Sequence, residues 1–271
     1  MSESRVRVPD LREKKRRGEK IAVLTAYDAT MARLLDGAGV DVLLVGDSVG
    51  VVMLGYEHTL PVTLDEMLHH TRAVARGARH ALVVADMPFM TYQVSAEEAV
   101  RNAGRLLQAG AAAVKVEGGP AVTGAIRRMV EVGIPVMGHL GLQPQSVHQM
   151  GGYRRQAMQR EDVEALVEDA HALERAGVFA IVLEAVGHDA ARLVTSAVSV
   201  PTIGIGAGPD CDGQVLVSHD MLGLFDGHIP SFVKQYAHLA EDVARAARAY
   251  ADDVRAGRFP EVARPAATRE S

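Results

Sequence analysis

Eight short runs of β-branched and apolar residues recur along this 271-residue chain, with stretches of helical periodicity between them. Runs this apolar are typical of strands buried on both faces, as in a parallel sheet that helices cover. The expected strands are Ile21–Ala26, Val40–Gly46, Ala81–Asp86, Ala112–Glu117, Ile134–His139, Phe179–Glu184, Thr202–Gly206 and Gln214–Ser218. Eight β–α alternations with short links predict an α/β fold, the closed (β/α)8 TIM barrel, with an open doubly wound sheet as the alternative.

Capping and termination signals support the helices expected between these strands. Thr63 with Glu66, and Ser95 with Glu98, fit the S/T-x-x-E capping box found at helix starts. A glycine, which commonly ends a helix, follows several of the helical runs and precedes a strand. The expected helices include Leu64–Arg76, Ala96–Ala109, Gly124–Val132 and Glu161–Ala176.

The chain has no linker, low-complexity tract or change of composition that would divide it. Its length suits a barrel, which typically has roughly 250 residues. The sequence therefore predicts a single domain over residues 1–271, with an ordered core at about 8–262. A long terminal helix is expected over Phe232–Val254, and the tail Arg264–Ser271 is expected to fray.

Charge and composition exclude several classes of partner. A net charge of −5 gives no general attraction to nucleic acid or to an anionic membrane. No apolar run is long enough to span a bilayer. The single cysteine, Cys211, excludes an intramolecular disulfide and fits a reducing cytosol. The basic run Lys14–Arg17 is interpreted as a solvated helix face, with a partner contact as the alternative.

Three successive expected strands close on a carboxylate: Asp47, Asp86 and Glu117. A carboxylate at the end of a buried strand is costly to desolvate unless it meets a cation. Each acid taken alone could form a salt bridge. The three together predict a metal site at one end of the barrel, and carboxylate ligands favour a hard divalent ion such as Mg²⁺ or Mn²⁺.

Strand alternation predicts which other side chains share that end of the barrel. Side chains two apart point the same way, so Lys115 and Glu117 should face inward together, and Val45 should share a face with Asp47. The expected mouth holds Asp47, Asp86, Lys115, Glu117, His139 and Glu184. Lys115 could pair with Glu117 or meet a substrate carboxylate beside the metal. His139 could act in catalysis or only form hydrogen bonds.

Glu184 stands apart from the other acids, on the sixth expected strand. A carboxylate in an apolar enclosure, away from the cation, has its pKa raised and can act as a general base. With three acids for the metal and Glu184 as a separate base, the implied chemistry is proton abstraction beside a carbonyl that the metal polarises.

Two connections are longer than the barrel requires: Ser48–Pro61 after the second strand and Leu140–Arg160 after the fifth. Both begin on the face where barrel enzymes keep their active sites. Long loops in a compact domain are usually functional, although either could be a surface excursion.

A set of motifs closely resembles the ketopantoate hydroxymethyltransferase family, in order and almost without gaps from about residue 8 to about residue 262. The motifs are Leu24–Asp28, Val45–Ser48, Leu60–Thr63, Val84–Pro88, Lys115–Gly119, Met137–His139, Pro144–His148 and Pro201–Gly208. Small departures are Ala185, where a Cys often follows the glutamate, and Ser231, where the family often has Lys.

The resemblance implies a barrel of the phosphoenolpyruvate/pyruvate superfamily and the first committed step of pantothenate synthesis. It implies that Asp47, Asp86 and Glu117 hold Mg²⁺, and that Glu184 accepts the proton. The 2-oxo acid, 3-methyl-2-oxobutanoate, would be contacted by Asp47, Ser48, Asp86 and Lys115. The family also implies 5,10-methylenetetrahydrofolate as one-carbon donor, a homodecamer of two five-membered rings, and a cytoplasmic location.

The folate ends in glutamate carboxylates and must approach over the open mouth of the barrel. Arg154 and Arg155 lie in the loop after the fifth strand and could pair with those carboxylates through two parallel hydrogen bonds. The alternative for these arginines is a salt bridge between subunits.

Two other functions compete with hydroxymethyl transfer. One is a Mg²⁺-dependent carbon–carbon lyase of the same superfamily acting on a 2-oxo acid. The Lys115–Gly119 context and the absence of a cysteine beside the metal strands argue against it. The other is a catalytically silent barrel that binds metabolites or serves as a scaffold, and the complete set of acids argues against that function.

Overall fold

A computed structural model of the chain describes residues 5–152, 156–157 and 159–260. Eight parallel strands form a closed barrel in which each strand pairs with the next and β8 pairs with β1. The strands are β1 (Ile21–Thr25), β2 (Val42–Val45), β3 (Leu82–Asp86), β4 (Ala113–Glu117), β5 (Val136–Gly141), β6 (Ala180–Glu184), β7 (Thr202–Ile205) and β8 (Gly213–Leu216). The closed barrel confirms the predicted fold class and rules out the doubly wound sheet.

The chain divides into two compact units, Met1–Ser218 and His219–Ser271. All eight strands lie in the first unit. Whether the second unit folds with the barrel as one domain, as the sequence predicts, stays a prediction.

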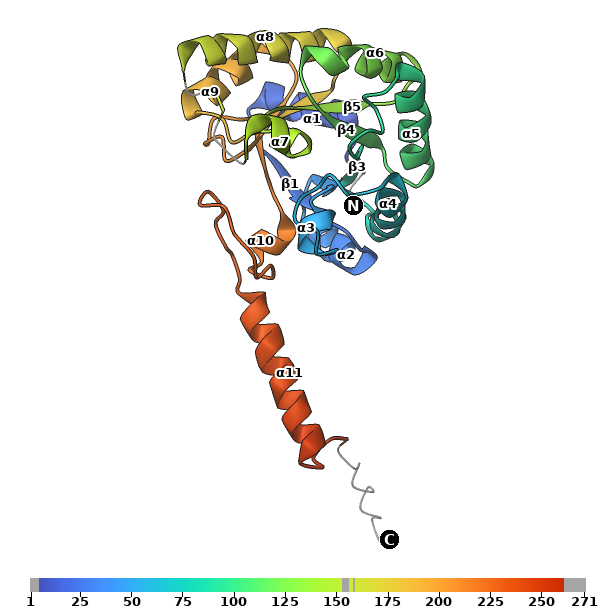
Figure 1. Cartoon of the computed structure of the whole chain (residues 1–271), viewed down its shortest axis with the longest axis vertical. Coiled ribbons are helices and arrows are strands. Elements are labelled where there is room, and N and C mark those ends of the chain that lie inside the picture. Colours follow the sequence, from blue (N-terminus) through green and yellow to red (C-terminus); the bar gives the residue numbers. More distant parts are fainter. Residues whose placement is uncertain (1–4, 153–155, 158, 261–271) are drawn as a thin grey trace. The chain divides into compact units, whose positions relative to one another are not determined.

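Long helices surround the strands of the first unit and contact one another in chain order (Figure 1). They are α2 (Ala29–Gly37), α4 (Leu64–Gly77), α5 (Ala96–Gln108), α6 (Thr123–Glu131), α8 (Arg160–Ala176) and α9 (His188–Ala197). The expected capping box is complete at Thr63, which accepts from the backbone N–H of Glu66 while the Glu66 side chain accepts from the backbone N–H of Thr63. At Ser95 only half of the expected box forms, the hydrogen bond that Ser95 accepts from the backbone N–H of Glu98. Short helical turns, α3 (Val49–Val52), η1 (Pro120–Val122), η2 (Pro144–Ser146) and α7 (Val147–Met150), follow β2, β4 and β5.

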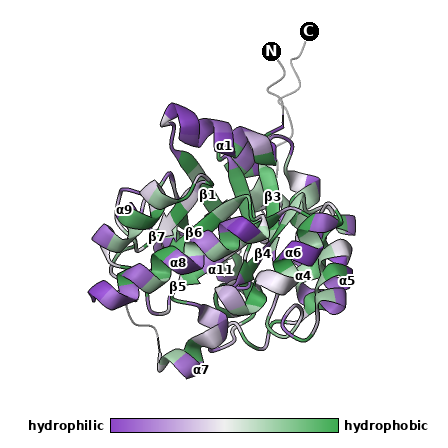
Figure 2. Cartoon of the chain, turned by 90° about the horizontal axis from the view of Figure 1, so that it is seen from above, coloured by the Kyte–Doolittle hydropathy of each residue, from purple (hydrophilic) through white to green (hydrophobic). Residues whose placement is uncertain are grey.

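Apolar side chains alternate between two separate cores. Leu44, Val84 and Val182 lie in the cluster inside the barrel, whereas Leu43 and Val83 pack in the cluster between strands and helices. This alternation explains why the strands carry hydrophobic residues on both faces, while the surrounding helices keep hydrophilic stretches (Figure 2).

Helix α1 (Val8–Arg17) closes the N-terminal end of the barrel. Leu11 is fully buried in the inner cluster, beside residues that begin the strands. Nζ of Lys14 lies 2.6 Å from a carboxylate oxygen of Asp41, and Nζ of Lys15 lies 2.9 Å from one of Asp212. The interpretation of the basic run as a solvated face is therefore wrong for these two lysines, because both fold down onto residues that precede strands.

The fifth strand is longer than expected. Strand β5 continues through Gly141 instead of ending at His139, because Leu140 and Gly141 still pair with Leu183 and Glu184. Gly141 has φ +88°, and a Cβ there would lie 2.3 Å from the carbonyl oxygen of Glu184, so only glycine fits.

The second unit contains the terminal helix α11 (Leu239–Arg255), and α10 (Ser218–Met221) lies at its start. The expected helix over Phe232–Val254 begins seven residues too early, because the segment before Leu239 forms turns. The backbone N–H of Tyr236 donates instead to the carbonyl of Met221. The tail Arg264–Ser271 lies outside the described residues.

No helix in the described part of the chain combines the length and apolarity that crossing a membrane requires.

Candidate active site at the C-terminal end of the barrel

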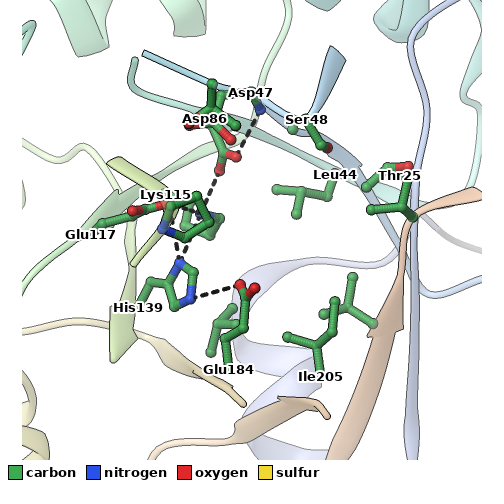
Figure 3. Close-up of a pocket in the computed structure, with 16 residues that line it drawn as sticks. Thr25, Leu44, Asp47, Ser48, Asp86, Lys115, Glu117, His139, Glu184 and Ile205 are labelled. Carbon is green, nitrogen blue, oxygen red and sulfur yellow. Dashed lines mark hydrogen bonds and ion pairs between the residues drawn. The ribbon is translucent and has the colours of Figure 1, made fainter. Parts of the chain in front are cut away.

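A cavity of about 110 Å³ opens at the ends of the strands in the first unit (Figure 3). All seven residues that the sequence assigns to the site line it: Asp47, Ser48, Asp86, Lys115, Glu117, His139 and Glu184. Its other lining residues are Thr25, Leu44, Gly46, Thr59, Pro144, Val182, Ile205, Val215 and Val217. The structure thus brings together residues that lie up to 137 positions apart in the chain (Asp47 to Glu184).

The strands deliver most of these side chains as alternation predicts. Asp86, Glu117 and Glu184 are the last residues of β3, β4 and β6, and Lys115 points inward two residues before Glu117. Each strand thus carries its charged residues into the barrel interior above an apolar layer.

Asp47 reaches the cavity by a different route. Strand β2 ends at Val45, which packs in the outer cluster, so the expectation that Val45 and Asp47 share a face is wrong. Alternation breaks at Gly46, where the chain turns toward α3 and brings Asp47 and Ser48 over the barrel mouth. A Cβ on Gly46 would lie 2.8 Å from Oγ of Ser48, so a side chain there would require the Ser48 hydroxyl to move.

Lys115 lies among the buried acids. Its Nζ is 3.0 Å from Oδ1 of Asp86 and 3.7 Å from Oε1 of Glu117, so its nearer partner is Asp86. Burial lowers the pKa of the ammonium, but the charges of Asp86, Glu117 and Asp47 outweigh burial and raise it. Lys115 is therefore cationic at neutral pH.

His139 lies between Glu117 and Lys115 on one side and Glu184 on the other. Its Nδ1 lies 3.4 Å from Oε1 of Glu117 and 3.3 Å from Nζ of Lys115, and its Nε2 lies 3.2 Å from Oε2 of Glu184 (Figure 3). Burial and Lys115 lower the pKa of the imidazole, while Glu117 and Glu184 raise it, for a net value of about 9. The site thus holds four carboxylates against one ammonium and one imidazole.

Glu184 lies on the far side of His139 from Glu117. Its side chain is 18% exposed and shares the cavity with apolar Val182 and Ile205. The expected separation from the other acids holds, but the enclosure is not purely apolar, because the imidazole contacts the carboxylate.

Asp47 and Asp86 lack sufficient positive charge around them. Burial raises the pKa of Asp47 well above its usual range, and the charges of Asp86 and Glu117 raise it further. Burial likewise raises the pKa of Asp86, against the opposing effect of Lys115. Oδ1 of Asp86 is buried and makes no hydrogen bond within the described residues, although it contacts Lys115.

The chemistry of these donors fits a divalent cation. Carboxylate oxygens are the ligands that hard cations prefer, and a doubly charged ion would offset the excess negative charge of the cluster. Within residues 5–152, 156–157 and 159–260, no three His, Cys, Asp or Glu side chains stand close enough together to hold an ion as they are. Holding one would require the side chains of Asp47, Asp86 and Glu117 to turn toward a common point.

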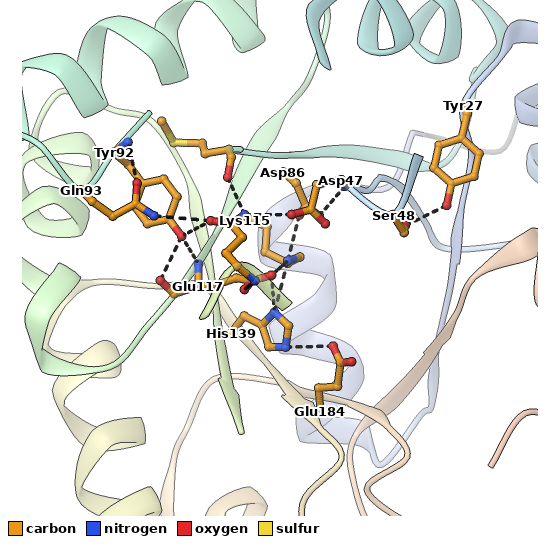
Figure 4. A network of polar contacts seen from close by, with 12 residues as sticks. Tyr27, Asp47, Ser48, Asp86, Tyr92, Gln93, Lys115, Glu117, His139 and Glu184 are labelled. Atoms are coloured by element: carbon orange, nitrogen blue, oxygen red, sulfur yellow. Dashed lines mark hydrogen bonds and ion pairs between the residues drawn. The ribbon is translucent and has the colours of Figure 1, made fainter. Parts of the chain in front are cut away.

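Two residues that the sequence did not single out join the site through hydrogen bonds. Gln145 and Tyr92 are buried, and together they contact Asp47 and Glu117. Figure 4 shows Tyr92 beside Glu117 in this network. Gln145 lies within the Pro144–His148 motif, which was its only signal in the sequence; Tyr92 carried none.

The loop after β5 contains Arg154 and Arg155, the residues considered for the folate carboxylates. Both lie outside the described residues.

Comparison with known proteins identifies the family. The family model for ketopantoate hydroxymethyltransferase matches residues 5–262. The chain is 59% identical to 3-methyl-2-oxobutanoate hydroxymethyltransferase of Moorella thermoacetica, over 95% of this chain and 96% of that protein. It is 56% identical to the enzyme of the same name from Syntrophus aciditrophicus, over 93% of each.

Solved structures with lower identity share the fold. Phosphonopyruvate hydrolase, solved with oxalate and Mg²⁺, superposes with a TM-score of 0.63 at 16% identity, covering 94% of this chain and 89% of that one. 2,3-Dimethylmalate lyase, of the PEP mutase/isocitrate lyase superfamily, gives 0.60 at 18% identity, covering 96% and 92%. These neighbours share the barrel fold, and the matches over nearly the whole sequence show that the chain belongs to the ketopantoate hydroxymethyltransferase family.

Proposed function

We propose that this protein transfers a hydroxymethyl group from 5,10-methylenetetrahydrofolate to 3-methyl-2-oxobutanoate, forming 2-dehydropantoate for pantothenate synthesis. The proposal rests on the arrangement of the charged residues around the cavity, together with the family to which the chain belongs. Three buried acids and Lys115 gather on one side, and Glu184 faces the same cavity from beyond His139.

Asp47, Asp86 and Glu117 would hold the divalent cation, with Mg²⁺ the expected ion. When bound, such a cation would polarise the 2-oxo group of the substrate and favour negative charge on its oxygen. The raised pKa values of Asp47 and Asp86 support this assignment. Both carboxyls are buried in a cluster where Lys115, although it lies 3.0 Å from Oδ1 of Asp86, does not offset burial and the neighbouring acids.

Lys115 and Ser48 would bind the 2-oxo acid, together with Asp47 and Asp86. Lys115 supplies a buried positive charge for the substrate carboxylate. Oγ of Ser48 lies 2.9 Å from the hydroxyl of Tyr27, which fixes its position at the edge of the cavity. A buried ammonium and a fixed hydroxyl would orient the substrate so that its C3 proton faces Glu184 and not the three acids proposed to hold the cation.

Glu184 would remove the C3 proton, leaving an enolate. Its C3 would bond to the methylene carbon of the folate while the two C–N bonds of that carbon break and water supplies the hydroxyl group. The remaining proton of water and the proton taken by Glu184 would end on the two folate nitrogens, giving tetrahydrofolate. Glu184 faces the cavity, and its contact with His139 holds its carboxylate in place. His139 lies 3.2 Å from the Glu184 carboxylate, but its raised pKa of about 9 favours the protonated imidazole, which cannot accept a proton, so Glu184 is the better candidate for the base.

The competing lyase function is not favoured. The relatives at 59% and 56% identity are named as hydroxymethyltransferases, whereas the lyase neighbour shares only the fold at 18% identity. We also propose a homodecameric assembly and a cytoplasmic location. Arg154 and Arg155 would either form a salt bridge between subunits or pair with the folate carboxylates.

A coupled assay tests the function. Purified protein, 3-methyl-2-oxobutanoate and methylenetetrahydrofolate should give 2-dehydropantoate with Mg²⁺ and lose that activity when the metal is removed by a chelator. Asp86→Ala should remove most of the activity and weaken Mg²⁺ binding while the protein still folds. Unchanged calorimetric Mg²⁺ binding in that variant would show that the metal lies elsewhere.

A further inference from the structure

Gln145 lies where the loop after β5 meets the acids of the site. It occupies the short turn η2 and is 5% exposed. Its backbone N–H donates to Oε2 of Glu117 at 3.0 Å, and its side-chain Nε2 donates to Oδ2 of Asp47 at 2.9 Å. One residue therefore contacts two of the three acids, which come from different strands.

The amide of Gln145 uses its full hydrogen-bonding capacity. Nε2 also donates to the carbonyl of Met87 at 3.0 Å. Oε1 accepts from the hydroxyl of Tyr92 at 2.8 Å and from Nε2 of Gln93 at 3.4 Å. An amide has two donors and two acceptor lone pairs, and all four are used here.

This pattern allows only one orientation of the amide. If the group were flipped, Oε1 would face the carbonyl oxygen of Met87 beside Asp47, so that two backbone and amide acceptors would meet without a proton between them. Burial makes such an arrangement costly. The Gln145 side chain therefore always presents an N–H to Asp47.

Tyr92 holds the amide in that orientation and is itself fixed by strand β4. Its buried hydroxyl accepts a hydrogen bond from the backbone N–H of Glu117 at 3.0 Å (Figure 4). Oε1 of Gln145, at 2.8 Å, is the nearer of two acceptors for the single hydroxyl proton. The carbonyl of Glu117 lies 3.1 Å from the same hydroxyl. The position of Glu117 is thereby linked through Tyr92 and Gln145 to that of Asp47.

We infer that Gln145 and Tyr92 are positioning residues: they anchor one oxygen each of Asp47 and Glu117, so that the second oxygen of each acid can turn toward the divalent cation, an inference that rests on the proposed function. Neither residue need touch substrate. Groups that orient metal ligands typically change metal affinity by about 10- to 100-fold when they are removed. The pair would also make cation binding depend on the placement of the loop after β5.

The two residues should differ in their effects. Replacing the Gln145 side chain removes the donor to Asp47 but keeps the backbone N–H to Glu117. Tyr92→Phe leaves that donor in place but removes the hydroxyl that selects the amide orientation and satisfies the N–H of Glu117. We expect the Gln145 variants to bind Mg²⁺ more weakly than Tyr92→Phe, and Tyr92→Phe more weakly than wild type.

The experiment is calorimetric Mg²⁺ titration of the metal-free full-length protein without substrate. Gln145→Leu keeps a side chain of similar volume without the amide, and Gln145→Ala also removes the volume. Gln149→Ala, in the same loop but exposed, is the matched control. Thermal unfolding of each protein shows that it is folded.

A Kd for Mg²⁺ at least about tenfold higher in Gln145→Leu, with Gln149→Ala unchanged, is the expected result. Wild-type affinity in both Gln145→Leu and Tyr92→Phe would overturn the positioning role while leaving the metal site intact. If Gln145→Ala bound weakly but Gln145→Leu bound normally, the residue would act by packing alone, which also overturns the inference. Absence of Mg²⁺ binding by wild type would instead refute the metal site of the proposed function, and the inference with it.

Discussion

At the scale of single residues, small side chains and buried acceptors set the geometry around the cavity. Gly46 lies at the turn that carries Asp47 and Ser48 over the barrel, and a Cβ there would lie 2.8 Å from Oγ of Ser48 and 3.6 Å from Oδ2 of Asp86. The space beside this glycine is therefore taken up by site residues.

Gly46→Ala should displace the Ser48 hydroxyl from its contact with Tyr27 and lower kcat/KM by about 10- to 100-fold, because a small misplacement of a binding group is costly. Steady-state kinetics with 3-methyl-2-oxobutanoate measure the effect. Gly104→Ala is the control, since no atom lies within 4 Å of its added Cβ. Equal kinetic constants for the two variants would contradict a spatial requirement at Gly46.

Asp36, near the end of α2, holds the connection from α4 to β3 through hydrogen bonds. It accepts hydrogen bonds from the backbone N–H groups of Arg79, His80 and Ala81 at 3.1, 2.9 and 2.7 Å. Burial raises the pKa of this carboxyl, but the three donors outweigh burial, and the net pKa lies below its usual range.

Asp36→Ala should lower the free energy of unfolding at pH 7 by about 1–3 kcal/mol, since buried donors lose their acceptor. Because the folded-state pKa is depressed, this stabilisation is complete above the unfolded-state value of about 3.9 and is lost as the pH falls through the folded-state pKa. In urea unfolding, the difference in the free energy of unfolding between wild type and variant should therefore become smaller below about pH 4. An equal difference in the free energy of unfolding at pH 7 and at about pH 3 would show that the ionised carboxylate of Asp36 is not the source of the stabilisation.

At the scale of elements, the two ends of the barrel have different tasks. Helix α1 closes the N-terminal end with Leu11 and with the ion pairs of Lys14 and Lys15, while the carboxylates gather at the other end. The residues that stabilise the barrel and those proposed to carry the chemistry therefore lie at its opposite ends, as in barrel enzymes generally.

Leu11→Ala tests this separation. Removal of a fully buried leucine should lower the free energy of unfolding by about 2–5 kcal/mol. Mg²⁺ affinity should stay at the wild-type value, because the substitution is at the end of the barrel opposite the acids. A large change in affinity with little loss of stability would mean that α1 supports the site directly.

Sequence patterns predict strands better than they predict loops, and the site reflects this difference. Alternation placed Asp86, Glu117 and Glu184 because each ends a regular strand. It failed for Asp47, which follows a turn, where the period of two no longer applies. The contacts of Gln145 depend on the path of the loop after β5, which local patterns do not determine.

At the scale of the whole molecule, the assembly stays a prediction. The family resemblance implies a homodecamer, and no residue of α11 is buried although the helix carries Val243, Tyr250 and Val254. Light scattering after size-exclusion chromatography should give a mass about ten times 28.9 kDa. A monomer mass at micromolar concentration would contradict the decamer.

The central claim is that Glu184 removes the C3 proton of 3-methyl-2-oxobutanoate beside a metal held by Asp47, Asp86 and Glu117. Proton NMR in deuterated water, with Mg²⁺ but without folate, tests it most directly, because exchange at C3 reports proton removal alone. Wild-type protein should replace the C3 proton with deuterium, and the exchange should stop when Mg²⁺ is chelated or when Glu184 is replaced by Gln, although Glu184→Gln should still bind Mg²⁺. Exchange at the wild-type rate in Glu184→Gln, or without any divalent ion, would contradict the account.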